Sequence, residues 1–286
     1  MEEGYWMQRR QRGRWKIIVL FLAIFFSLPI IAAKVPLLAE EQPVIESPKQ
    51  DTKIAYAANK DKALATKVSE KKQTKSFNTL IYFTHSHEAY YPILKKQQQT
   101  ITVYNDSTNV QSLGDLFVKH FKQNHIDTDV LGVDTMKVMK QQQMAFYQAY
   151  DAVRPYVKKQ IDTKDYDLIM DIHRDSAGRK VTTTTYKGTP YARMVLVIGG
   201  KNKQFQANEA YAEQLSKKLN RLVPGISRGV MRKTGTGVNG IYNQDLSKQI
   251  ILIELGGVEN NEEELNRSIA ILARAIEEAF VEPASS

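Results

Sequence analysis

The sequence predicts an α/β domain with a mostly parallel sheet flanked by helices. Three apolar runs, 79–83, 168–172 and 250–253, have the composition of buried strands. Between them lie segments in which apolar residues recur every three or four positions, as they do on one face of a helix. Strands that alternate with helices along a chain are typical of a parallel sheet that is covered on both faces.

The elements can be placed in order from the first strand, which begins near Phe77. Pro155 is expected either to kink a long helix or to divide it in two. The last helix has the clearest start, because Asn261 or its neighbour Asn260 can cap it and Glu264 or Glu263 completes a capping box. The expected elements beyond the first strand are a polar loop (90–109), a helix (112–124), a short strand (129–131), a helix (137–161), a strand (166–173), a Thr-rich hairpin (181–188), a strand (194–198), a helix (206–222), a strand (250–254) and a final helix with the buried stripe Leu265, Ile269, Leu272, Ile276 and Phe280.

The composition limits the class of protein. A chain of 286 residues with 42% apolar residues is long enough for one sizeable domain plus accessory segments. Residues 1–76 carry 14 Lys/Arg against 8 Asp/Glu, and the remainder carries 26 against 23, so most of the net charge of +9 lies outside the expected domain. This distribution argues against a nucleic-acid-binding face on the domain. Since there is no cysteine, any metal must be held by His, Asp or Glu.

The N-terminal part of the sequence predicts a membrane anchor and a tether. Residues 1–16 form a basic cytoplasmic segment, and residues 17–33 contain no charged side chain. As a helix this apolar stretch is about 25 Å long, which is close to the hydrocarbon thickness of a bilayer. We expect an uncleaved transmembrane anchor, with signal-peptidase cleavage at the Ala-Ala pair that ends the stretch as the alternative. Residues 34–76 are expected to be a flexible linker, and residues 77–286 to form the extracytoplasmic domain.

Side chains that can hold a metal follow three of the expected strands. His85 and Glu88 come after the first strand, His173 ends the second, and Glu254 ends the third. Groups at the carboxyl ends of neighbouring parallel strands meet in one crevice, so we expect these side chains to converge. Two neutral imidazoles and a carboxylate bind zinc and leave a position for water, and a further carboxylate is needed to move the proton of that water. We therefore predict a zinc hydrolase. Its metal ligands are His85, Glu88 and His173, and its catalytic residue is Glu254.

Four short blocks of the sequence together resemble the stage II sporulation protein P family. They are Thr84-His85-x-x-Glu88, Asp171-Ile172-His173-Arg174-Asp175-Ser176, Tyr242-Asn243-Gln244-Asp245-Leu246-Ser247 and Ile251-Leu252-Ile253-Glu254-Leu255-Gly256-Gly257. The resemblance implies the amidase/phosphorylase-like fold of zinc N-acetylmuramoyl-L-alanine amidases. It implies a peptidoglycan hydrolase that cuts the bond between the lactyl group of muramic acid and L-alanine, with an endopeptidase activity on stem-peptide cross-links. It further implies work on septal cell wall during sporulation engulfment, alongside engulfment-complex membrane proteins.

The family's metal ligands and catalytic glutamate fall on the same four residues, in the same roles. The sequence departs from the family's usual pattern at Phe83, His87 and Ala89. On an extended strand end, His87 would point to the same side as His85, so His87 could lie near the metal or the substrate, and it is the alternative to His85 as the metal ligand.

Further polar residues are candidates for binding substrate or for supporting the metal ligands. Asp171 or Asp175 could orient a metal-bound imidazole. Arg174 could bind a substrate carboxylate or stabilise an oxyanion, and an ordinary ion pair that fixes the loop is the alternative for Arg174 and Asp175. Asn243 could line the cleft, with a side-chain-stabilised turn as the alternative. The complete set is His87, Asp171, Arg174, Asp175 and Asn243.

Two other functions remain open at this point. Because Phe83 and Ala89 depart from the family beside the site, the domain could be a catalytically inactive scaffold that binds cell wall. Glu88 and Glu254 could instead serve a metal-free glycoside hydrolase. We expect the zinc amidase, held in the cell membrane by a single span with its C-terminal domain outside the cytoplasm. Its expected partners are peptidoglycan, the cytoplasmic membrane and engulfment-complex proteins, and no nucleic acid.

Overall fold

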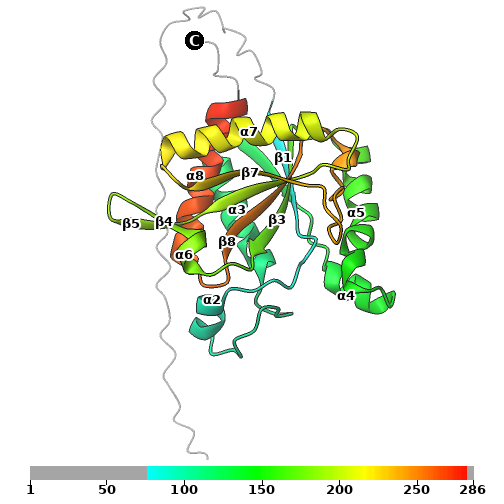
Figure 1. The fold of residues 1–286 in the computed structure, drawn as a ribbon, viewed down its shortest axis with the longest axis horizontal. Helices are drawn as coiled ribbons and strands as arrows, with labels where there is room; N and C mark the ends of the chain where they lie inside the picture. Colours follow the sequence, from blue (N-terminus) through cyan, green and yellow to red (C-terminus); the bar gives the residue numbers. More distant parts are fainter. Residues whose placement is uncertain (1–75, 282–286) are drawn as a thin grey trace, which may run out of the picture. The chain divides into compact units, whose positions relative to one another are not determined.

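The structure, a computed structural model, describes residues 76–281 (Figure 1). The expected basic segment (1–16), the expected transmembrane segment (17–33) and all but the last residue of the expected linker (34–76) lie outside this range. Within residues 76–281, no helix is both long and apolar enough to cross a membrane.

Six strands form a central sheet in the order β2-β1-β3-β8-β6-β7. The strands β2, β1, β3 and β8 run parallel to one another. The strand β6 is antiparallel to β8, and β7 is parallel to β6. The prediction of a mostly parallel sheet is therefore confirmed, with two reversed strands on one side. The bounds are β1 Phe77–Tyr82, β2 Ile126–Val130, β3 Leu168–Asp175, β6 Met194–Gly199, β7 Ser227–Lys233 and β8 Ile250–Gly257.

Helices cover both faces of this sheet (Figure 1). In Figure 1, α4 and α5 lie to the right of the sheet, while α7 crosses above it and α8 lies to the left. The α-helices are α2 Tyr91–Lys96, α3 Gly114–Gln123, α4 Thr135–Gln141, α5 Ala149–Thr163, α6 Arg179–Thr182, α7 Phe205–Leu222 and α8 Glu262–Phe280. The 3₁₀ turns are η2 Val110–Leu113, η3 Phe146–Gln148 and η4 Gln244–Leu246.

The alternation of side chains along each strand divides the core into two layers. Ile81 of β1 packs into the larger cluster, which includes residues of α3, α7 and α8. Its neighbours Leu80 and Tyr82 point the other way and pack with Val153 and Val157 of α5. Successive residues of a strand face opposite sides, so one strand supplies both layers. On β3, Asp171 and His173 share the parity of Ile169, which packs with α5. Asp171 and His173 therefore belong to the α5 face of the sheet.

Several element predictions are confirmed. The Thr-rich hairpin is formed by β4 (Thr183–Tyr186) and β5 (Thr189–Ala192), which pair antiparallel. The last helix begins as expected, because Asn261 caps α8 and forms a capping box with Glu264. Its predicted stripe is buried from Leu265 to Ile276 and only partly buried at Phe280.

Other element predictions are wrong. The segment 137–161 is not one helix divided at Pro155; it is interrupted at 142–148, and Pro155 lies inside α5. Within this interruption, Gln143 has a left-handed backbone with a φ of 54°. The helix is therefore broken near Gln143 and not at Pro155. The loop 90–109 contains a helix, α2. The edge strand β7 was not predicted.

Candidate metal and catalytic site

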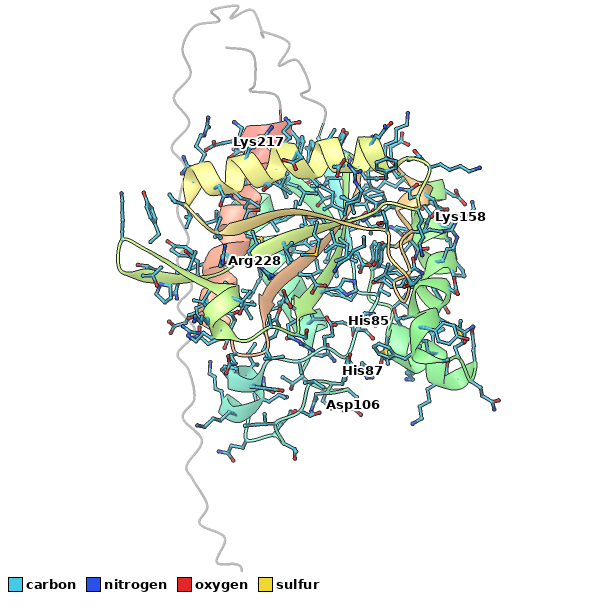
Figure 2. The ribbon with its side chains drawn as sticks, viewed as in Figure 1. His85, His87, Asp106, Lys158, Lys217 and Arg228 are labelled. Atoms are coloured by element: carbon cyan, nitrogen blue, oxygen red, sulfur yellow. The ribbon has the colours of Figure 1, made fainter. Side chains whose placement is uncertain are left out.

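Three neighbouring strands bring the predicted site residues together. The strands β1, β3 and β8 are adjacent in the sheet, and all three run in the same direction. His173 of β3 stands directly opposite Glu254 of β8 in the register. His85 and Glu88 follow the end of β1 in a tight turn, in which the Glu88 amide donates to the His85 carbonyl at 3.0 Å. Figure 2 shows His85 at this end of the sheet.

The rings of His85 and His173 are close enough to share a metal ion. Their centroids are 5.2 Å apart, and their planes lie at 80°. The Nδ1 atom of His85 is buried and has no hydrogen-bond partner among residues 76–281. Burial, followed by the neighbouring His173, lowers the pKa of His85 to about 4. The His85 imidazole is therefore neutral at physiological pH and has a lone pair available, as a metal ligand requires.

Glu88 is buried beside His173 and the end of β3. Its side chain accepts a hydrogen bond from the Arg174 amide at 2.7 Å, and the same oxygen lies 4.0 Å from His173 Nδ1. Burial raises the pKa of Glu88, while His173 and Arg174 oppose that shift. Glu88 thus places a carboxylate oxygen on the Nδ1 side of the His173 ring.

Asp171 contacts the opposite edge of the same ring. Its Oδ2 lies 3.0 Å from His173 Nε2, although the two groups are not aligned for a hydrogen bond. Thr84 holds the Asp171 carboxylate in place, since its amide donates at 3.0 Å and its hydroxyl at 2.7 Å. A carboxylate behind a histidine orients that ring towards a metal and makes it a better ligand. Asp171 therefore lies where a residue that orients the His173 ring would stand.

The surroundings of His173 are negative. Burial lowers the pKa of His173, but Asp171, Glu88 and Glu254 outweigh burial and raise the pKa to about 10. At that pKa the His173 imidazole is itself protonated and supplies the positive charge that these buried carboxylates require. A metal ion that replaced this proton would meet the same requirement. The cluster is therefore suited to binding a cation.

Glu254 completes the cluster from β8. Its side chain is partly exposed, but its Oε2 atom is buried without a hydrogen-bond partner. Burial raises the pKa of Glu254 to about 7, against the influence of His173. A carboxylate with a free oxygen beside His173 and a second carboxylate, Glu88, is placed to exchange a proton with a bound ligand.

The donor set fits zinc in its chemistry. It offers one neutral imidazole with a free nitrogen, one imidazole supported from behind by Asp171, and one buried carboxylate. Among residues 76–281, no three His, Asp or Glu side chains are already arranged at coordination geometry. The His85 ring stacks on Phe146, with centroids 4.7 Å apart and planes at 8°. Coordination of an ion by this set therefore requires side-chain adjustment.

His87 follows His85 in the turn after β1, but its ring contacts a different side chain, Asp134. The expectation of an extended strand end is wrong, because β1 ends at Tyr82 and residues 84–87 form a turn. His87 Nε2 lies 2.9 Å from Asp134 Oδ1, at an angle that makes no hydrogen bond. The ring therefore faces the start of α4.

Arg174 and Asp175 do not form the ion pair that was the alternative for them. Arg174 donates to backbone carbonyls, to Val103 at 3.0 Å and to Asp175 at 3.2 Å, and its Nε is buried without a partner. The Asp175 carboxylate pairs with Arg228 of β7 and accepts from the Ala177 amide at 2.8 Å. Arg174 thus fixes the loop that carries Val103, and Asp175 joins β3 to β7.

Asn243 and its neighbours make structural contacts. Asn243 accepts from Arg154 at 3.0 Å and donates to the Tyr150 carbonyl at 2.9 Å. Asp245 forms a bidentate pair with the same arginine. Gln244 is buried and bonds the backbone of β6. These contacts favour the turn interpretation of the segment, and they join it to α5 beside the site.

Two aromatic residues of the site were missed by the sequence analysis. Tyr150 stacks on His173 at 6.2 Å and meets His85 edge-on at 5.8 Å. Phe146 covers His85 from the loop before α5. The sequence gives no sign of either contact, since both residues fall within a segment that reads as a continuous helix.

The glycine pair after Glu254 allows close packing beside the site. Gly256 has a φ of +64°, and a Cβ on Gly257 would lie 2.2 Å from the Ala177 carbonyl oxygen. The first residue needs a left-handed backbone and the second has no room for a side chain. The glycine pair thus lets the end of β8 pack closely against the loop after β3.

The model of the family described as stage II sporulation protein P (SpoIIP) matches residues 32–277. The protein named "Stage II sporulation protein P" from Bacillus subtilis (strain 168) is 38% identical over 201 residues, which cover 70% of this chain and 50% of that protein. The chain therefore spans about half the length of this relative.

Solved structures show weaker likeness. An N-acetylmuramoyl-L-alanine amidase from Clostridium difficile 630 has a TM-score of 0.43 and 13% identity, covering 72% of this chain and 95% of that chain. The amidase Ami1 from Mycobacterium smegmatis has a TM-score of 0.41 and 11% identity, covering 71% and 96%. The assignment to a family rests on the sequence comparisons.

Proposed function

Because the chain belongs to the stage II sporulation protein P family, we propose that it is a membrane-anchored peptidoglycan hydrolase, a zinc-dependent N-acetylmuramoyl-L-alanine amidase. The observation that carries the proposal is the set of buried, unpartnered donors at one strand end. His85 Nδ1 and Glu254 Oε2 have no partner within the described chain, and both belong to the cluster around His173. Buried polar atoms are normally satisfied, so these two mark a place for a ligand.

His85, Glu88 and His173 would hold the zinc ion. When bound, zinc would supply Lewis acidity, which polarises a carbonyl and makes water a stronger acid. Asp171 holds the His173 ring from behind, and Thr84 holds Asp171. This supporting layer keeps one ring nitrogen of His173 turned towards Glu88.

Glu254 moves the proton in the proposed reaction. Its free oxygen accepts a proton from the attacking water and returns it to the amide nitrogen of L-alanine. The carbonyl carbon of the lactyl group gains the water oxygen, and the bond from that carbon to nitrogen breaks. The products are a lactyl carboxylate on the glycan and a free amino group on the stem peptide. The same arrangement could also cut a peptide cross-link, which is the proposed endopeptidase activity.

The test is digestion of purified peptidoglycan by the full chain, followed by mass analysis of the products. We expect new L-alanine amino termini, and we expect their release to stop on addition of a chelator and to resume on addition of zinc. His173→Ala and Glu254→Gln should both remove the activity. Release that continues at the unmodified rate in either variant would contradict the proposal.

The inactive scaffold is the alternative that the same experiment addresses. Phe83 and Ala89 motivated it, but both are buried, at 1% and 0% exposure. Both belong to the apolar core beside the site. A folded chain that binds cell wall, carries no zinc and releases no amino termini would support the scaffold. New reducing ends without new amino termini would support a glycoside hydrolase.

The proposed location is the outer face of the cytoplasmic membrane. It follows from the apolar segment 17–33 and the basic segment before it. We propose septal cell wall during sporulation engulfment as the substrate and engulfment-complex membrane proteins as partners. Fractionation of sporulating cells and protease accessibility of the domain test the location.

A further inference from the structure

Two half-exposed aromatic rings lie against the proposed site. Phe146 is 49% exposed and Tyr104 is 41% exposed. They come from loops far apart in the sequence, yet their rings meet edge-on, with centroids 5.7 Å apart and planes at 70°. Large aromatic side chains are seldom left exposed in contact with one another unless the surface binds something. We refer to Phe146 and Tyr104 as the aromatic platform.

The aromatic platform is joined to two of the proposed metal ligands. The Phe146 ring stacks face to face on His85 at 4.7 Å. The backbone of Tyr104 forms an isolated β-bridge with Glu88. A molecule bound on the platform would therefore lie next to the residues proposed to hold zinc.

The charge of the two loops limits what the aromatic platform can bind. Segments 97–109 and 141–150 contain no Lys or Arg, and their single acidic side chain is Asp106. In Figure 2, Asp106 lies beyond His85 and His87, farther from the sheet. Anionic membranes and nucleic acids are recognised through clusters of Lys and Arg, which these loops lack. The charge pattern therefore favours a neutral ligand.

The remaining side chains of the two loops are mostly amides, hydroxyls and exposed apolar groups. Three glutamines begin each segment, and Asn105, Ser107 and Thr102 lie close to Tyr104 in the chain. Aromatic rings combined with neutral hydrogen-bonding groups suit a sugar ring. The C–H face of a pyranose is weakly positive and packs on the negative face of an aromatic ring, while its hydroxyl and acetamido groups bond amides.

We propose that the aromatic platform binds a saccharide ring of the glycan strand and so presents the amide attached to that strand to the site. This inference rests on the proposed function, because it assumes that peptidoglycan is the substrate. It makes the sugar part of the recognised substrate. The protein should then cut the amide on a glycan strand far faster than the same amide in a stem peptide that carries only a lactyl group on its L-alanine.

The binding test uses N-acetylchitohexaose, a neutral glycan with no stem peptide. Affinity is measured by calorimetry on the full chain carrying Glu254→Gln. We expect Tyr104→Ala and Phe146→Ala each to weaken binding about five- to tenfold, the loss of one aromatic contact. Tyr104→Phe and Phe146→Trp keep a ring and should bind within about twofold of the parent. Tyr147→Ala is the matched control, since it removes a neighbouring ring that is 78% exposed and is not part of the aromatic platform.

The outcomes separate this inference from the proposed amidase activity. Equal affinity for the hexasaccharide in Tyr104→Ala, Phe146→Ala and the parent would overturn the platform, whether or not the chain is an amidase. Loss of binding to anionic lipid vesicles or to a free stem peptide, with hexasaccharide binding intact, would also overturn it. A platform that binds sugar in a chain with no amidase activity would support the inference and contradict the zinc amidase alone. Circular dichroism melting of each variant confirms that the fold is retained.

Discussion

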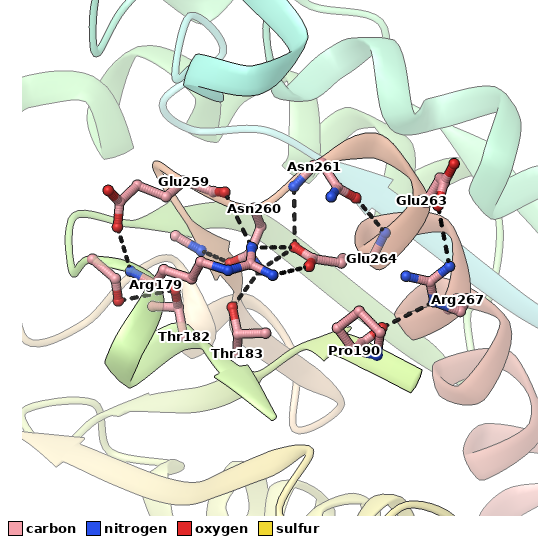
Figure 3. A network of polar contacts seen from close by, with 12 residues as sticks. Arg179, Thr182, Thr183, Pro190, Glu259, Asn260, Asn261, Glu263, Glu264 and Arg267 are labelled. Atoms are coloured by element: carbon pink, nitrogen blue, oxygen red, sulfur yellow. Dashed lines mark hydrogen bonds and ion pairs between the residues drawn. The ribbon is translucent and has the colours of Figure 1, made fainter. Parts of the chain in front are cut away.

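Buried acids occur in two clusters of this domain, and the two clusters differ in how those acids are satisfied. In the site cluster, Glu254 keeps a buried oxygen without a partner. In the Glu264 network, formed by Glu264 with Arg179, Asn260 and Asn261, the carboxylate accepts hydrogen bonds at both oxygens (Figure 3). Glu254 belongs to β8, and Glu264 belongs to α8, the helix that follows it. The difference teaches that burial of an acid does not itself indicate function; a buried acid without a partner does.

The Glu264 network shows what a structural carboxylate looks like. Asn260 donates to Glu264 at 2.8 Å, the Asn261 amide at 3.2 Å and Arg179 at 2.9 Å. These bonds tie the short helix α6 to the start of α8, as Figure 3 shows. Every contact is supplied by the chain, so the network has no place for a ligand and its removal should cost stability.

The largest expected effect is loss of activity at the unsatisfied acid. Glu254→Gln keeps the shape of the side chain but removes its capacity to accept a proton, and the rate of L-alanine amino-terminus release should fall about 10²- to 10⁴-fold. Thermal stability should stay the same or rise, because a buried carboxylate with a raised pKa is removed. Zinc content per chain serves as the control and should not change. A variant with near-normal rate would remove the distinction between the two clusters.

The satisfied acid should show the reverse pattern. Glu264→Ala leaves Asn260 and Arg179 without their acceptor, and we expect it to lower the free energy of unfolding by about 2–3 kcal/mol. The figure is kept at the low end because the Arg179 side chain is 45% exposed and partly screened by solvent. Urea unfolding followed by circular dichroism measures the change. The rate of L-alanine amino-terminus release per folded molecule should not change.

A control for this prediction lies one residue away. Glu263 is 83% exposed and pairs with Arg267 at 3.5 Å. Glu263→Ala should therefore change stability by less than about 0.5 kcal/mol. Equal losses from Glu263→Ala and Glu264→Ala would show that the burial of the network contributes nothing.

A third variant, at Asp171, tests whether an acid of the site cluster supports a metal ligand without binding the metal. Asp171 contacts His173 but is itself fully bonded by Thr84, so it is expected to support a metal ligand without binding metal. Asp171→Asn should weaken zinc binding about 10- to 100-fold. Competition with a fluorescent chelator measures the affinity.

Asp175→Asn is the comparison for that variant. This acid lies on the same strand but pairs with Arg228, so its loss should change zinc affinity much less. If both variants weaken zinc binding equally, the effect of Asp171 comes from its charge alone and does not depend on its contact with His173.

The sequence identified the strands of the site more reliably than the loops around it. The runs that end at His173 and Glu254 are apolar, and adjacent parallel strands bring their ends together whatever the chain does between them. The position of His87 depends on a tight turn after Tyr82, which no glycine or proline announces. The contact of Phe146 with His85 depends on an interruption among glutamines, which are good helix formers. Local propensity carries no information about either contact.

The edge strand β7 was not predicted, for a related reason. The strand β7 reads Ser-Arg-Gly-Val-Met-Arg-Lys, whose charges and glycine resemble a loop. An edge strand needs only one side of its backbone paired, and charged side chains there discourage further pairing. Sequence patterns identify buried strands by their apolar content, and β7 has little of it.

The smallest expected effect is a change in how stability depends on pH at the satisfied acid. Burial alone raises the pKa of Glu264, but the hydrogen bonds from Arg179, Asn260 and the Asn261 amide outweigh it, so the folded pKa lies below the ordinary value of 4.5. A carboxyl with a lowered folded pKa contributes stability above its unfolded pKa and loses that contribution as the pH falls through the folded value. The stability difference between the parent and Glu264→Gln should therefore be greatest above about pH 5 and shrink towards pH 3. Urea midpoints at several pH values measure it, and a difference that stays constant down to pH 3 would mean that the charge of Glu264 does not stabilise the fold.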